Sequence, residues 1–290
     1  VSEGIQGEID PDSNNFIIIM NIKSIIVKLF TTSVRMCGKT QFIIDTVLPP
    51  SIEILMPEYS EASVFKTPEI LSLFANLSMK LHNEIMKYID QIFQLLIHPT
   101  LQYLTDYSTN FPYWKNFIIL ILALVQIPTL MTSLPNEEID VFMQSLKLCC
   151  GHPQIEISEK GLQALMDLLS VLETRTTVQF FNDFIAFYGL DLMQFVMGLL
   201  TDSVHRFAFN LLIGLSKRLI SLSQIKSKEA DLFQIFTEMF PNRPANEMSE
   251  LIEKMIQLSS SYLDYKLIMK NFLINASKFA VNDPALYKKE

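Results

Sequence analysis

Apolar side chains recur along the chain at steps of three and four residues. This spacing places them on one face of an α-helix. Three stretches show it clearly, within residues 85–96, 162–172 and 232–239. Sustained alternation of apolar and polar residues, which would indicate β-strands, is hard to find. The pattern therefore predicts an all-α protein.

Short breaks at prolines and glycines separate the helical stretches. One break is a well-formed helix start, in which Thr67 is the expected N-cap, Pro68 the first-turn proline and Glu69 the first-turn acid. Helix pairs are expected to open near Asn15, Thr67, Phe111, Ile155, Ser203 and Pro244, at spacings of 52, 44, 44, 48 and 41 residues. Repeats of about 40–47 residues are typical of HEAT and armadillo proteins.

The period predicts an α-solenoid of antiparallel helix pairs, with five to six HEAT repeats in a single segment that spans residues 1–290. The expected repeats cover residues 15–64, 65–109, 110–153, 154–202, 203–243 and 244–281. Because each pair would bury one side on the preceding repeat and another on the next, the helices should carry wide apolar faces. The segment is expected to be part of a longer array.

Composition agrees with stacked helices, since 49% of residues are hydrophobic, 19% are charged and only eight are glycine. A mean hydropathy of +0.27 raises the question of a membrane. The longest apolar run, Phe117 to Val125, has nine residues, whereas a bilayer-spanning helix needs about 20. The sequence therefore predicts buried helices and no membrane insertion.

The formal charge of −8 is unevenly distributed. Residues 51–200 hold 16 acidic and 7 basic side chains, a net charge of −9, whereas residues 201–290 hold 10 and 12, a net charge of +2. Nucleic-acid binding depends on clustered lysine and arginine. The acidic middle therefore argues against direct binding of nucleic acid.

Motifs for phosphate binding, dinucleotide binding, a nucleophile elbow and a zinc protease are all missing from the sequence. The nearest approach to a metal site is Cys149, Cys150 and His152, but adjacent cysteines on a helix point about 100° apart. Buried thiols are the preferred interpretation. We therefore expect no enzyme, no catalytic or metal-binding residues and no cofactor, and three cysteines without a secretory signal suit a reducing compartment.

Two charged clusters are candidates for partner binding. Glu137, Glu138 and Asp140 open a predicted helix and could meet a basic partner, although first-turn acids also complement the helix dipole. The basic candidates are Arg206, Lys217 and Arg218, with Lys226 and Lys228 nearby. They could contact an acidic partner, another part of the same molecule, or only solvent. The lone Trp114 and most methionines are expected in the core.

A series of short motifs follows in order along the chain. The motifs are Leu48-Pro49-Pro50, Glu58-Tyr59, Lys66-Thr67-Pro68-Glu69-Ile70-Leu71-Ser72, Gly161-Leu162-Gln163, Thr201-Asp202-Ser203 with His205, Phe240-Pro241, and Tyr265-Lys266 with Asn271-Phe272-Leu273-Ile274. Together they resemble the late repeats of the exportin-1 family of karyopherin-β nuclear export receptors. One departure is Pro112-Tyr113-Trp114-Lys115, where the family has a Pro-Glu-His-Arg block.

The resemblance implies a HEAT solenoid that binds Ran-GTP and cargo with leucine-rich export signals. It also implies that the protein contacts nuclear pore proteins and shuttles between nucleus and cytoplasm. It also implies that this segment is the C-terminal arch and that the cargo groove, with its reactive cysteine, lies in upstream repeats. None of Cys37, Cys149 and Cys150 should then take that cysteine's role. The alternative is a HEAT-repeat adaptor or regulatory scaffold, such as a phosphatase or vesicle-coat subunit.

Overall fold

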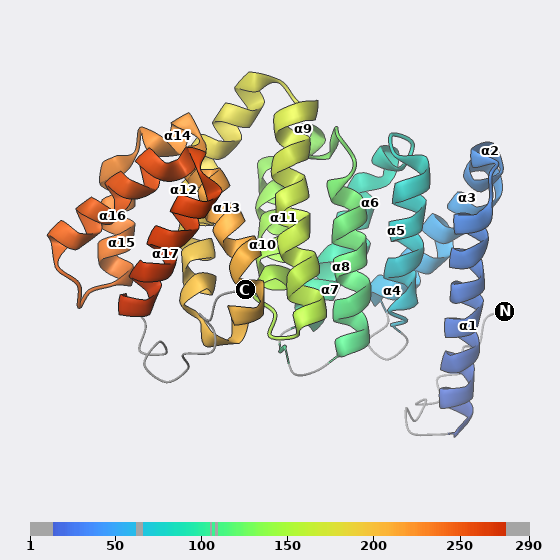
Figure 1. Cartoon of the computed structure of the whole chain (residues 1–290). Coiled ribbons are helices and arrows are strands. Elements are labelled where there is room, and N and C mark those ends of the chain that lie inside the picture. Colours follow the sequence, from blue (N-terminus) through green and yellow to red (C-terminus); the bar gives the residue numbers. More distant parts are fainter. Residues whose placement is uncertain (1–13, 62–65, 105, 108–109, 277–290) are drawn as a thin grey trace. The chain divides into compact units, whose positions relative to one another are not determined.

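The computed structural model describes residues 14–276 except 62–65, 105 and 108–109. Every regular element within this part of the chain is a helix, and no strand occurs there. The prediction of an all-α protein is confirmed. The chain forms two compact units, Val1–Leu146 and Lys147–Glu290, and each unit is built from helices packed in layers (Figure 1).

In the first unit, helices α1 (Asn14–Met36), α5 (Glu69–Leu81) and α8 (Phe111–Val125) lie side by side in one layer (Figure 1). The second layer contains two irregular helical stretches and the first part of α10 (Asn136–Cys150), which follows the short α9 (Leu130–Ser133). The irregular stretches comprise α2 (Thr40–Phe42), η1 (Ile43–Val47), α3 (Leu48–Pro50), η2 (Ser51–Leu55) and α4 (Met56–Glu61), then η3 (Ile85–Tyr88), α6 (Ile89–Ile92), η4 (Phe93–Ile97) and α7 (His98–Tyr103).

Prolines explain the irregular stretches. A proline within a helix cannot donate to the carbonyl four residues earlier, and its ring collides with that carbonyl. The wider π-turns η1, η2 and η4 each end shortly before such a proline, at Pro49, Pro57 and Pro99. A wider turn makes room for the ring and lets the chain stay helical.

The core between the two layers of the first unit is aromatic and aliphatic. Phe74, Phe93, Phe117 and Phe142 are fully buried, and the ring centroids of Phe93 and Phe142 are 6.3 Å apart. Trp114 is 1% exposed, so the prediction that it belongs to the core is confirmed. Burial of these rings and of the aliphatic side chains around them stabilises this unit.

In the second unit, α11 (Ile155–Arg175), α13 (Phe209–Ser221) and α17 (Tyr262–Ala276) form one layer. The facing layer contains α12 (Val178–Thr201), α14 (Ser223–Lys226) and α15 (Glu229–Met239) (Figure 1). The remaining elements are η5 (Ser203–Ala208), α16 (Ala245–Gln257), which packs against α13, α15 and α17, and η6 (Leu258–Ser260).

Two helices among the described residues are long and apolar enough to cross a membrane by length and composition, at Ile17–Met36 and Val178–Thr201. The sequence had indicated no such segment because charged and polar residues interrupt every apolar run. Core helices of soluble proteins also satisfy this criterion, and the apolar window of Val178–Thr201 is 44% buried in its own unit. The corresponding window of Ile17–Met36 is only 11% buried.

Candidate partner-binding surface

The acidic start of α10 has two different sides. Glu138 turns inward, where its carboxylate accepts a hydrogen bond from Nε2 of Gln94 at 2.8 Å and lies 3.1 Å from Nε2 of His98. Glu137 and Asp140 are exposed, and their spacing of three residues places them on a common side of the helix. Glu138 therefore joins α10 to the neighbouring helical stretch, whereas Glu137 and Asp140 are presented to solvent.

The basic candidates of the second unit also differ in their environments. The guanidinium of Arg218 donates to the carbonyl of Met166 at 3.1 Å, to Oγ of Ser170 at 2.8 Å and to the carboxylate of Glu173 at 2.8 Å. Arg218 thereby fastens α13 to α11. The side chain of Lys217, the adjacent residue, is half-buried and makes no hydrogen bond or ion pair with other described residues.

Arg206 lies in η5, before α13, whereas Lys217 lies near the end of α13. The ammonium of Lys228 donates to the carbonyl of Ala186 at 2.8 Å and so ties the start of α15 to α12. Arg206 and Lys217 therefore lie near opposite ends of α13. Glu137, Glu138 and Asp140 belong to the first unit, and the basic residues belong to the second.

The two adjacent cysteines at the end of α10 are buried, as the sequence predicted. Burial raises the pKa of both the Cys149 and the Cys150 thiol, so both stay protonated near neutral pH. Across the part of the chain that the structure describes, no three Cys, His, Asp or Glu side chains lie close enough together to hold a metal ion. Cys149 and Cys150 behave there as small apolar side chains.

Gly161 explains why the Gly-Leu-Gln motif requires glycine. A Cβ atom built on Gly161 would lie 2.6 Å from the backbone nitrogen of Cys150, closer than real Cβ contacts. Ser158 lies one turn before Gly161 on α11, and its Oγ donates to the carbonyl of Cys150 on α10 at 2.6 Å. The missing side chain therefore lets the backbones of α10 and α11 approach directly.

The Thr201-Asp202-Ser203 motif with His205 forms a polar connection between α12 and α13. One carboxylate oxygen of Asp202 accepts from the backbone N–H of Val204 at 3.0 Å, and the other lies 2.8 Å from Nδ1 of His205. The carboxylate caps η5 and fixes the orientation of the buried imidazole. This motif therefore serves as a structural turn between α12 and α13.

His152 is a second buried imidazole in this unit. Its Nδ1 accepts a hydrogen bond from the backbone N–H of Gln154 at 3.0 Å, which selects the neutral ring. Burial, with a smaller contribution from nearby His205, lowers the pKa of His152 to about 4. A neutral imidazole at this position stabilises the turn that follows α10.

The Glu-Tyr and Lys-Thr-Pro-Glu motifs of the first unit also serve as internal anchors. The buried hydroxyl of Tyr59 lies 2.7 Å from Oγ1 of Thr100. The Lys66 ammonium stands 5.6 Å from the ring centroid of Tyr59 and 6.0 Å from that of Tyr103. Burial lowers the pKa of Lys66, and the hydroxyl of Tyr113 donates to the Lys66 carbonyl.

The predicted cap before α5 is displaced by one residue. Pro68 occupies the N-cap position and makes no side-chain capping bond, so Thr67 is not the N-cap. The carbonyl of Thr67 instead accepts from the backbone N–H of Ile70 at 3.1 Å. Oε1 of Glu69 accepts from Ser24 and lies 3.0 Å from the Lys28 ammonium, which ties α5 to α1.

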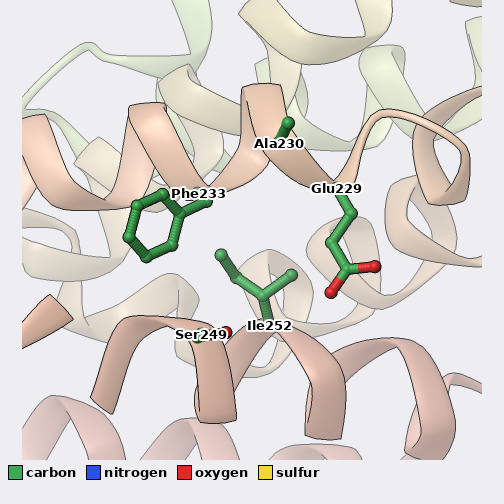
Figure 2. A pocket seen from close by; sticks show the side chains of 5 residues that line it. All are labelled: Glu229, Ala230, Phe233, Ser249 and Ile252. Atoms are coloured by element: carbon green, nitrogen blue, oxygen red, sulfur yellow. The ribbon is translucent and has the colours of Figure 1, made fainter. Parts of the chain in front are cut away.

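A shallow groove of about 170 Å³ lies between α15 and α16. Figure 2 shows the ring of Phe233 and the side chain of Ile252 along the groove, with the Glu229 carboxylate at one end. Ala230 and Ser249 complete its lining. The sequence offered no signal for this groove, because its residues come from two helices separated by the Phe240-Pro241 break and their facing positions depend on how the helices pack.

Taken together, the layers of paired helices and the internal role of the motifs define a helical-repeat protein. A family model described as "CRM1 C terminal" matches residues 2–281. Protein EXPORTIN 1B of Arabidopsis thaliana is 22% identical over 298 residues, covering 94% of this chain and 27% of the relative. Exportin-1 of Dictyostelium discoideum is 23% identical over 297 residues, covering 93% of this chain and 28% of the relative.

The chain belongs to the CRM1 C-terminal family, the C-terminal region of exportin-1 proteins. The resemblance inferred from the ordered motifs is confirmed. The chain spans about a quarter of the length of the curated relatives that it matches.

Proposed function

We propose that the chain is the C-terminal helical-repeat segment of a nuclear export receptor. Its match to the CRM1 C-terminal family over residues 2–281 carries this proposal. The whole receptor would bind Ran-GTP and cargo with leucine-rich signals, contact nuclear pore proteins and shuttle between nucleus and cytoplasm. In this role the segment is a non-enzymatic scaffold, and the six expected helix-pair repeats are its units.

The internal role of the motifs supports a scaffold rather than an active site. Asp202 with His205, Tyr59 with Thr100, and Gly161 each hold neighbouring helices or turns together. A solenoid of such repeats adds small changes between neighbours into a change of curvature along the array. The segment would therefore help the receptor to open and close around its partners.

The full-length receptor provides the direct test. It should bind a leucine-rich export peptide more tightly in the presence of Ran-GTP than with Ran-GDP, because the two ligands are expected to favour one closed form. Isothermal titration with and without each nucleotide form of Ran would measure the coupling. Equal peptide affinity under both conditions would contradict the proposal.

Variants within this segment address the candidate partner contacts. Lys217→Glu should weaken Ran-GTP association without changing the melting temperature, because Lys217 makes no internal ion pair with the described residues. Glu137→Lys, on the exposed side of α10, should behave similarly. Arg218→Ala is the matched comparison, and it should lower stability by about 1–2 kcal/mol because it removes the contacts with Glu173 and Ser170. Unchanged Ran-GTP binding in both charge variants would remove Lys217 and Glu137 from the binding surface.

A further inference from the structure

Two buried imidazoles stand where the chain enters and leaves the hairpin of α11 and α12. Only residues 176–177 separate these two helices. His152 lies in the turn before α11, and His205 lies in η5, directly after α12. Their side chains are 0% and 3% exposed. Because η5 packs against both α11 and α12, the two turns lie at the same end of the hairpin.

The hydrogen bonds of the two rings determine where their protons are. Nδ1 of His152 accepts from the backbone N–H of Gln154 at 3.0 Å, so the proton of this neutral ring is on Nε2. Nδ1 of His205 lies 2.8 Å from the Asp202 carboxylate, which accepts but does not donate, so the proton there is on Nδ1. Nε2 of His152 is therefore a donor, and Nε2 of the neutral His205 ring is an acceptor.

The acceptor on His205 is buried and has no hydrogen-bond partner among the described residues. Buried polar atoms in native proteins are nearly always bonded, either to protein or to ordered water. The complementary donor on His152 is close by, since burial and, to a smaller extent, His205 lower the pKa of His152. The two Nε2 atoms are not bonded directly to each other. One water molecule can accept from the first atom and donate to the second.

A metal ion is a poorer occupant of this position than water. Because the neutral His152 ring carries its proton on Nε2, only the lone pair of His205 is available for coordination there. The thiols of Cys149 and Cys150 stay protonated near neutral pH. A water molecule fits the donor and the acceptor without a change in either ring.

We propose that one buried water molecule bridges Nε2 of His152 and Nε2 of His205 and thereby closes the α11–α12 hairpin at its open end. The hydrogen bonds then run from the backbone of Gln154 through both rings to Asp202. Because Asp202 also accepts from the backbone N–H of Val204, the bridge joins the turn before α11 to the turn after α12. The repeat formed by these helices therefore moves as one body when the array changes its curvature.

An experimental structure of the full-length protein, at a resolution that shows ordered water, tests the occupant. We expect a water molecule at hydrogen-bond distance from Nε2 of both His152 and His205. A direct bond between the two rings, a metal ion at this position, or a site without density would each overturn the proposal.

Two substitutions remove the bridge and keep the bond within each turn. His205→Asn keeps a side-chain N–H that can donate to Asp202, and His152→Asn keeps an acceptor for Gln154, but neither variant has a group at the position of Nε2. Amide hydrogen exchange of the full-length protein, followed by mass spectrometry, measures the effect. Each variant should exchange faster in both turns, at residues 154–158 and 203–209. The double variant should exchange little faster than either single variant.

Val204→Ala is the matched control, because Val204 is 48% exposed and lies beside His205 but outside the bridge. It should leave exchange at residues 154–158 unchanged. Faster exchange confined to the turn that carries the substitution, or the same distant effect in Val204→Ala, would contradict the inference. Neither experiment requires Ran or cargo, so the bridge can be absent while the proposed export function stands, and the reverse is also true.

Discussion

At the scale of single residues, the motifs that mark the family act through local contacts. The Asp202 carboxylate accepts a hydrogen bond from the backbone N–H of Val204 and lies beside Nδ1 of His205. The backbone N–H of Gln154 donates to the imidazole of His152. Each contact fixes the conformation of a turn, and a typical hydrogen bond of this kind contributes about 0.5–1.5 kcal/mol. Such residues specify the turns between helices rather than chemistry.

His152 should make stability depend on pH. The unfolded imidazole takes up a proton near pH 6.5, whereas the folded ring does so only near its pKa of about 4. The unfolded state therefore binds more protons between these values, and the free energy of unfolding falls as the pH decreases from about 6.5 to 4. Urea unfolding across this range would measure it.

His152→Asn is the matched variant, because its Oδ1 can still accept from the Gln154 N–H while the side chain cannot titrate. The variant should lose less stability than the wild type between pH 6.5 and 4. Identical pH dependence in the two proteins would show that His152 does not carry the effect.

At the scale of elements, α10 and α11 approach backbone to backbone at Gly161. Gly161→Ala should destabilise the chain by about 1–3 kcal/mol, because the added Cβ would meet the Cys150 backbone rather than a flexible side chain. Thermal or urea unfolding of the purified chain measures the change.

Gly198→Ala is the matched control, since Gly198 lies within α12 and a Cβ there would meet nothing within 4 Å. Alanine also has the higher helix propensity, so this variant should be neutral or more stable by up to about 1 kcal/mol. If both substitutions had the same effect, a steric role for Gly161 would be excluded.

At the scale of the whole molecule, the isolated segment should lack the cargo binding that is expected of the full-length receptor. Because the resemblance places the cargo groove in upstream repeats, the isolated 290 residues should not bind leucine-rich export peptides. Fluorescence anisotropy with a labelled peptide measures this directly, with the full-length receptor plus Ran-GTP as the positive control. Micromolar binding by the isolated segment would place a groove within it.

Much of the architecture could be predicted from the sequence alone. Helical periodicity predicted an all-α protein, and helices begin at Phe111 and Ile155 as expected. The predicted N-cap at Thr67 was wrong by one residue, because Pro68 occupies that position. The π-turns before Pro49, Pro57 and Pro99 could not be predicted, because a proline indicates where a helix is disturbed but not which wider turn relieves the disturbance.

The candidate surface was less predictable from the sequence. Glu137 and Glu138 are adjacent and chemically alike, yet Glu138 is bonded to Gln94 and His98 while Glu137 is exposed. Arg218 is likewise bonded to Glu173, whereas the adjacent Lys217 is half-buried and makes no hydrogen bond or ion pair through its side chain with other described residues. Neighbouring residues on a helix point about 100° apart, so their roles depend on which helix lies on each side.

The sequence by itself determined the helical class, the order of the family motifs and the absence of a recognisable catalytic motif, because periodicity and local spacing are properties of consecutive residues. Only the tertiary structure decided which charges are internal, why Gly161 must be glycine, and which side of α1 is left uncovered. Those features depend on pairs of helices that meet in space, and a linear pattern does not specify which faces meet.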